Sequence, residues 1–176
     1  EYLRSPDPYI ALAAAGAVTE KILLGTGIGL PAQHDPITFA KELATLDWMT
    51  KGRFIFGIGY GWNHEEMENH GIAVKTRRAH VRESMLAMRE LWSKDVASFE
   101  GEFVRFEPSW QWPKPIQKPH PPMWMACTNR ATIEVAARNG LGALAFSFVD
   151  PDEARTWAST YYDIIRSEEC KPLTHV

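Results

Sequence analysis

The sequence predicts an α/β protein built on a parallel sheet. Four short apolar segments alternate with four helical segments along the chain, which is the pattern of strand-helix units. The apolar segments have few interruptions, as expected for strands that are covered on both faces. An open doubly wound sheet and part of an eight-stranded barrel both fit this pattern. A complete barrel needs about 250 residues, and this chain has 176.

The first two units are predicted from composition and from helix-start signals. A helix over Tyr9–Glu20 is indicated by its Ala and Leu content, and an apolar strand over Ile22–Ile28 follows it. Asp35-Pro36 begins the next helix, because Asp accepts from free N–H groups and proline suits the first turn. This helix runs to about Met49. After the turn at Lys51-Gly52, Phe54–Ile58 is the second buried strand.

The remaining regular elements follow the same logic. A polar segment over residues 63–71 forms one or two helical turns that Gly71 ends. A longer helix over Lys75–Trp92 has its apolar side chains near one face. The rest are strands over Pro122–Ala126 and Gly142–Phe146, a helix over Asn129–Asn139, and a last helix from Asp150-Pro151 to about Arg166.

Residues 99–122 interrupt the alternation as a Pro- and Trp-rich excursion from a single domain that spans 1–176. Phe99–Phe106 predicts a small hairpin, and Pro108–Pro122 holds six of the 12 prolines. That proline density predicts a connection without regular structure. Long connections of this kind cover a site or pack through their own side chains, and Trp110 and Trp112 could do either.

Bulk properties exclude several classes of protein. With 19 basic against 22 acidic residues and a net charge of -3, the chain lacks the basic surface that binds nucleic acid. Its longest weakly polar run, Tyr9–Val18, is about half of the roughly 20 residues that a membrane-spanning helix needs. Cys127 and Cys170 cannot build a disulfide framework, so a cytoplasmic location is expected. The chain opens without an initiator Met or signal segment, which suggests a fragment of a longer protein.

Two motifs have simpler explanations than the sites they suggest. Residues 57–61, Gly-Ile-Gly-Tyr-Gly, follow a strand like a dinucleotide-binding loop, but the third glycine is one position too early. A tight turn from strand to loop explains them better. His64, Glu68 and His70 suggest a metal site but do not follow the HExxH order, so a solvated polar face is preferred and no metal is assigned.

Polar residues follow two neighbouring strands at the point where each strand ends. Cys127, Thr128 and Asn129 end one strand, and Ser147 follows the next. In parallel α/β folds ligands bind beyond the carboxyl ends of strands, where hydroxyls and helix N-termini can hold a phosphate. Helix capping by Thr128 or Asn129 explains the same residues equally well. Both interpretations remain open at this point.

A family resemblance is carried by residues 51–63, Lys-Gly-Arg-Phe-Ile-Phe-Gly-Ile-Gly-Tyr-Gly-Trp-Asn. Together with Glu66, Glu68, Asn69 and Gly71, this stretch resembles the signature of the bacterial luciferase-like monooxygenase superfamily. The helix that contains Arg77, Arg78 and residues 85–92 resembles the same superfamily, as do residues 99–103 and 112–117. The similarity covers nearly the whole chain and is somewhat greater to members that use a deazaflavin.

The resemblance implies a (β/α)8 TIM barrel that binds reduced FMN or the deazaflavin coenzyme F-420 at its C-terminal rim. This chain would supply strands three to six and an insertion. Family members carry a non-prolyl cis peptide at the end of the third strand, which maps to about Gly27-Ile28. By the same resemblance, Tyr60, Gly61 and Trp62 line the ring or substrate pocket, and the cofactor phosphate is held by Cys127, Thr128, Asn129 and Ser147.

The implied activity is that of an oxidoreductase or monooxygenase acting on a small organic substrate, with the cofactor supplying hydride or oxygen chemistry. A separate flavin or deazaflavin reductase and a homo-oligomeric full-length protein are expected as well. No catalytic residue is assigned, because the first two strands of the family fold have no counterpart here. Two alternatives stay open: a non-catalytic flavin-binding barrel, and a nicotinamide-dependent dehydrogenase, which predicts a helix directly after Gly61.

Overall fold

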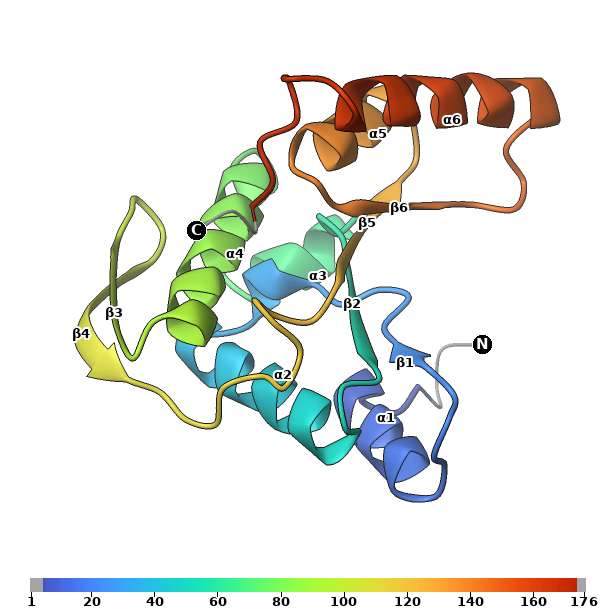
Figure 1. Ribbon diagram of the computed structural model, residues 1–176. Helices are drawn as coiled ribbons and strands as arrows, with labels where there is room; N and C mark the ends of the chain where they lie inside the picture. Colours follow the sequence, from blue (N-terminus) through green and yellow to red (C-terminus); the bar gives the residue numbers. More distant parts are fainter. Residues whose placement is uncertain (1–4, 174–176) are drawn as a thin grey trace.

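The computed structural model describes residues 5–173 and contains a four-stranded parallel sheet (Figure 1). The strands lie in the order β1-β2-β5-β6, which follows the chain without a reversal. A doubly wound sheet reverses its strand order part-way, whereas a barrel does not. The predicted α/β fold is confirmed, and the order is that of a half barrel. The strands are β1 (Leu24–Gly25), β2 (Phe54–Ile58), β5 (Met123–Cys127) and β6 (Gly142–Ala145).

Helices follow or precede each strand. Two of them start at the predicted Asp35-Pro36 and Asp150-Pro151, and α1 starts in the same way at Asp7-Pro8, one residue before the predicted Tyr9. Asp7, Asp35 and Asp150 each precede a proline, and each carboxylate accepts a backbone N–H of the first turn. Within residues 5–173, no helix has both the length and the apolar character needed to cross a membrane. The helices are α1 (Pro8–Ala17), the short 3-10 helix η1 (Pro31–Gln33), α2 (Pro36–Met49), α3 (His64–Asn69), α4 (Arg77–Ser93), α5 (Arg130–Arg138) and α6 (Pro151–Ile165).

The core lies between one face of the sheet and the helices. Alternate side chains of β2 and β5, such as Phe56, Ile58 and Met125, are buried on this face. Trp92 of α4 is buried with them, and its indole N–H donates to the Ala40 carbonyl of α2 at 2.9 Å. Figure 1 shows α2, α4 and α5 in an arc around this side of the sheet. The other face corresponds to the interior of a closed barrel.

The first unit is shorter than the sequence predicts. Helix α1 ends at Ala17 rather than Glu20, and β1 contains only two residues of the expected Ile22–Ile28. Ile22 and Leu23 are 59% and 64% exposed, so the expectation that both faces are covered is wrong for this end. The reason is that the Ile22 carbonyl accepts from the Arg53 guanidinium at 2.8 Å instead of joining a strand ladder.

The excursion contains more regular structure than expected. Strands β3 (Val96–Glu100) and β4 (Arg105–Trp110) pair antiparallel, so Pro108 lies inside a strand. The register shifts between Ala97 and Phe99, opposite this proline, and a proline is tolerated at such a bulge because no ladder N–H is needed there. Figure 1 places this hairpin outside α4, away from the four-stranded sheet.

Residues 111–122 have no regular structure, as predicted, and they are fastened to α2 by polar contacts. The buried Asp47 carboxylate accepts the backbone N–H of Gln117 at 3.0 Å and its side-chain amide at 2.6 Å. Trp110 and Trp112 are exposed, and the Lys114 ammonium lies 5.6 Å from the centre of the Trp112 ring, so Trp112 makes a contact within the connection.

The hairpin is held to α4 by one carboxylate. Glu83 accepts the backbone N–H groups of Glu102, Phe103 and Val104 at 3.1, 2.8 and 3.1 Å. Desolvation favours a higher pKa for Glu83, but these three donors outweigh it and hold the pKa below its usual value. The ionised form therefore binds the hairpin turn more strongly than the protonated form.

This contact should make the hairpin sensitive to acid. Because the pKa is lowered in the folded state, the contact stabilises the protein above the ordinary Glu pKa of about 4.3 and is lost as pH falls through the folded value. Hydrogen-exchange protection factors of amides 102–104, measured on the full-length protein, should fall in that acidic range. Glu83→Gln should show weaker and pH-independent protection. A wild-type profile that stays flat down to pH values well below 4.3 would contradict the assignment.

Candidate functional site

A cleft of about 660 Å³ opens at the carboxyl ends of the parallel strands. The chain reaches it after β1 at Gly27-Ile28, after β2 at residues 59–62, at the end of β5 at Thr128, and after β6 at Phe146. Sequentially distant segments meet here because parallel strands all end at the same edge of the sheet. Helices add four further side chains to the wall: Glu66, Arg77, Arg78 and Thr132.

The end of β1 forms a bulge against β2. The Gly29 N–H donates to the Gly57 carbonyl at 2.8 Å, and the Gly59 N–H donates to the Gly29 carbonyl at 3.0 Å. The Thr26 N–H still donates to the Ile55 carbonyl at 3.4 Å, whereas Gly27 and Ile28 leave the ladder, and the peptide between these two residues is cis. The expectation of a non-prolyl cis peptide at this position is confirmed.

The glycines after β2 are explained by close approach and by backbone conformation. A Cβ atom on Gly59 would lie 1.9 Å from the Ile28 Cδ1 atom, and Gly61 has a φ of +77° that favours glycine. Trp62 and Asn63 then separate Gly61 from the six-residue helix α3, whose N-terminus the Asn63 side chain caps. A helix directly after Gly61, which the nicotinamide alternative predicts, is therefore absent from the described chain.

Arginine side chains give the cleft a positive wall. The Arg78 guanidinium carbon lies 5.5 Å from the centre of the Tyr60 ring, within the range of a cation-π contact. Burial raises the pKa of the Tyr60 hydroxyl, and the charge of Arg78 opposes this effect only partly. Arg77 donates from Nη1 to the Val74 carbonyl at 2.6 Å, while its buried Nε has no partner among residues 5–173. Two guanidinium groups beside one acid, Glu66, favour an anionic ligand group.

Capping accounts for part of the predicted phosphate-binding set. The Asn129 side chain accepts the Thr132 N–H at 3.1 Å and so caps α5, as the second interpretation proposed. Thr132 returns a capping contact, since its hydroxyl accepts the Asn129 N–H at 3.3 Å. Thr128 is exposed and lines the cleft. The hydroxyl-bearing residues at this corner are therefore Thr128 and Thr132, of which the sequence indicated only the first.

Three predicted residues lie outside the cleft wall. Cys127 is fully buried on the opposite face of β5, where its thiol donates to the Met125 carbonyl and burial raises its pKa to about 11. Asn129 is used in capping, and Ser147 is exposed one residue beyond Phe146. The structure brings the other predicted residues together in one cleft: Gly27, Ile28, Tyr60, Gly61, Trp62 and Thr128.

Comparison with known proteins identifies the fold family. A family model described as luciferase-like monooxygenase matches residues 1–170. The chain belongs to this family. The solved structure of the monooxygenase RslO1 from Streptomyces bottropensis aligns with this luciferase-like chain at a TM-score of 0.85 and 35% identity, covering 96% of this chain and 52% of that one.

Sequence relatives of this luciferase-like chain include proteins with different cofactors. An uncharacterized protein of Mycobacterium tuberculosis is 51% identical over 122 residues, 69% of this chain and 43% of its own. The oxygenase component of flavin-dependent trigonelline monooxygenase from Acinetobacter baylyi is 32% identical, covering 77% of this chain and 38% of that protein. F-420-dependent glucose-6-phosphate dehydrogenase from Intrasporangium calvum is 31% identical, covering 77% and 42%. The chain spans less than half of the length of these relatives.

Proposed function

We propose that the protein carrying this chain is an oxidoreductase whose rim cleft binds reduced FMN or coenzyme F-420. These cofactors share a planar three-ring system and a phosphate group. The observation that carries the proposal is the composition of the cleft, in which a glycine-lined wall lies beside two guanidinium groups. Planar rings need close backbone approach, and phosphates need positive donors.

The ring is assigned to the side of the cleft formed by β1 and β2. Gly27, Gly59 and Gly61 line this wall together with the Gly27-Ile28 peptide, and a Cβ atom on Gly27 would meet no other atom within 4 Å. Trp62, which is 82% exposed, and Phe146 offer aromatic faces on the two sides of the opening. When bound, the cofactor supplies hydride transfer or oxygen chemistry, while the chain binds it, orients it and excludes water.

The phosphate is assigned to the corner where α4 and α5 begin. Arg78 and Thr128 line this part of the wall, whereas the Thr132 hydroxyl beside them already donates to the Asn129 carbonyl at 2.8 Å. The unpaired Nε of Arg77 is a buried donor that a bound anion could satisfy. Such an orphan donor is costly unless a ligand completes it. The donor set therefore fits an anionic cofactor group.

A titration of the full-length protein tests this assignment. Fluorescence titrations with FMN, under oxidising and reducing conditions, and with F-420 should show tight binding of at least one of them and no binding of NADH. If the protein binds neither FMN nor F-420, the enzyme proposal is refuted. If a cofactor binds, substrate-dependent oxidation separates an oxidoreductase from a non-catalytic flavin-binding protein. The name of the trigonelline relative, an oxygenase component, supports a separate reductase for the flavin case.

Arg78→Met should weaken binding of the preferred cofactor by about 1.5 to 3 kcal/mol, because a charge-assisted contact to phosphate is lost. Equilibrium titration measures this loss. If FMN is preferred, riboflavin, which lacks the phosphate, should bind wild type and Arg78→Met equally.

The matched control is Arg82→Met, about one turn further along α4, because Arg82 does not line the cleft. Its cofactor affinity should equal that of the wild type. An equal loss for riboflavin and FMN in Arg78→Met would instead assign Arg78 to positioning of the Tyr60 ring.

A further inference from the structure

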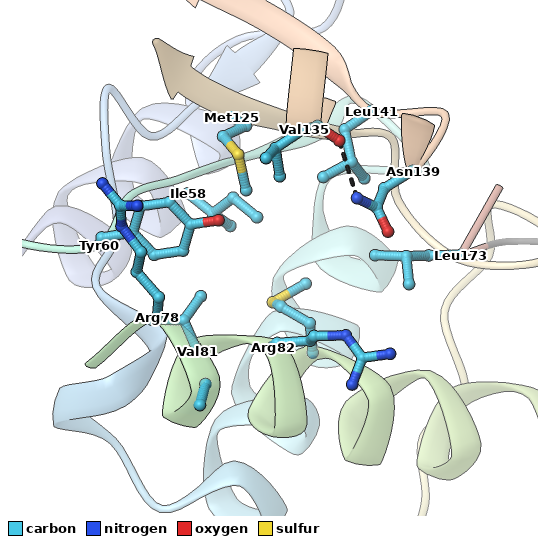
Figure 2. A pocket seen from close by; sticks show the side chains of 12 residues that line it. Ile58, Tyr60, Arg78, Val81, Arg82, Met125, Val135, Asn139, Leu141 and Leu173 are labelled. Atoms are coloured by element: carbon cyan, nitrogen blue, oxygen red, sulfur yellow. Dashed lines mark hydrogen bonds between the residues drawn. The ribbon is translucent and has the colours of Figure 1, made fainter. Parts of the chain in front are cut away.

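A second cavity lies on the helix-covered side of the sheet (Figure 2). It has a volume of about 220 Å³, is partly open to solvent, and is lined by residues of α4, α5, β2 and β5 and by Leu173. The space exists because α4 packs against α2 and β3, whereas α5 packs against β5 and α6. Between these two helices the side chains leave an unfilled chamber.

Most of the chamber lining is apolar, and its polar groups are the Tyr60 hydroxyl, the Asn139 amide and two arginines. Figure 2 shows side chains of α4 below the space and side chains of β5 and α5 above it. Asn139 donates one of its two side-chain amide N–H groups to the Val135 carbonyl at 2.7 Å. A cavity of about 150 Å³ lined by apolar side chains is enough to bind benzene. The apolar lining consists of Ile58, Val81, Met85, Met125, Val135 and Leu141, with Leu173 at the far side.

The charged groups on the chamber wall are both cations. Arg78 stands at the Tyr60 end, and Arg82 extends from α4 on the side nearer to Leu173 (Figure 2). No acidic side chain is part of the wall, and Arg82 has no ion pair within residues 5–173. The neighbouring acid, Glu83, faces the hairpin and accepts its backbone N–H groups. A small anion with an apolar tail complements this chamber. The tail would contact the apolar lining, and the negative group would pair with the Arg82 guanidinium.

We propose that this chamber is a binding site for a small aliphatic or aromatic carboxylate. The tail lies between Met85, Met125 and Leu141, and the carboxylate pairs with Arg82. Tyr60 separates this site from the rim cleft, since its ring belongs to both walls. The site does not depend on the cofactor assignment, because neither Arg82 nor the apolar lining beyond Tyr60 and Arg78 belongs to the cleft.

Hexanoate is a suitable probe, tested by isothermal titration and ligand-observed NMR on the full-length protein saturated with its cofactor. Hexanoate should bind, whereas hexylamine, with the same tail and the opposite charge, should not. Arg82→Met should weaken hexanoate binding about tenfold or more. Val135→Phe should abolish it by filling the chamber. Cofactor affinity should stay at the wild-type value in both variants.

Several results would overturn the proposal. These are no hexanoate binding at millimolar concentration, equal binding of hexylamine, wild-type affinity in Arg82→Met, or hexanoate binding that is seen only without the cofactor. If Val135→Phe does not fold, Ala79→Phe serves instead, because Ala79 is exposed on the chamber wall and tolerates a larger side chain without disturbing the core. Hexanoate affinity that is unchanged in a folded Ala79→Phe protein would also count against the site.

Discussion

Arg53→Met is expected to lower the free energy of unfolding of the full-length protein by about 3 to 5 kcal/mol, measured by urea denaturation. The guanidinium of Arg53 joins the end of α1, the segment before β1 and the end of α2. Methionine fills similar space but leaves several part-buried acceptors without a donor. The contacts that are lost run from Nε to the Thr50 carbonyl (2.9 Å), from Nη1 to the Ile22 carbonyl (2.8 Å) and the Thr19 hydroxyl (3.1 Å), and from Nη2 to the Gly16 and Thr19 carbonyls (3.0 and 2.8 Å).

Two controls separate geometry from charge. Arg53→Lys keeps the charge but lacks the planar set of donors, so it should retain only a minor part of the stability. Arg105→Met removes an arginine whose contacts with Glu100 and Glu107, at 3.6 and 4.0 Å, are solvent-exposed. That change should cost less than about 1 kcal/mol. Similar losses for Arg53→Met and Arg105→Met would show that the carbonyl contacts contribute little.

Gly57→Ala is expected to cost about 3 kcal/mol of stability and to weaken cofactor binding. A Cβ atom on Gly57 would lie 1.9 Å from the carbonyl oxygen of Thr26, which is a backbone atom and cannot rotate away. The Thr26 hydroxyl also donates to the Gly57 carbonyl at 2.7 Å. The substitution must therefore push the end of β1 away from β2, and the Gly27-Ile28 peptide moves with it.

Gly59→Ala is the matched comparison, two residues along the same segment. Its Cβ would also meet an atom at 1.9 Å, but that atom is Cδ1 of Ile28, the end of a flexible side chain. The expected loss of stability is only about 1 kcal/mol, while cofactor affinity still changes because Ile28 lines the cleft. Equal denaturation midpoints for the two variants would contradict this prediction. They would mean that moving the Thr26 backbone costs no more free energy than moving the Ile28 side chain.

Most of the fold could be predicted from local patterns. Asp35-Pro36 and Asp150-Pro151 start helices because capping involves only neighbouring residues, and both starts are present. The errors lie where a distant residue decides the outcome. The Arg53 guanidinium binds the Ile22 carbonyl, which belongs to the predicted first strand. The register shift between Ala97 and Phe99 lets Pro108 join a strand.

The site divides in the same way. Tyr60, Gly61 and Trp62 follow a buried strand, and strand ends form the rim of a parallel sheet, so their place in the cleft follows from sequence order. Arg78 and Thr132 had no comparable signal. They belong to helix starts whose direction depends on how α4 and α5 pack. Cys127 was predicted to hold the phosphate but is buried on the face of β5 opposite to the cleft. Adjacent side chains of a strand face opposite sides, and Thr128, the next residue, lines the cleft instead.

The sequence by itself determined the strand-helix alternation, the helix starts, the family and the segment that ends in the glycine-lined rim. The alternation and the helix starts depend on short-range periodicity and capping, whereas the family follows from the resemblance of residues 51–63 and the segments after them. Only the tertiary structure decided that Arg78 stacks on Tyr60 and that Cys127 is turned away. It also decided that an apolar chamber separates α4 from α5, since each of these depends on packing between segments far apart in the chain.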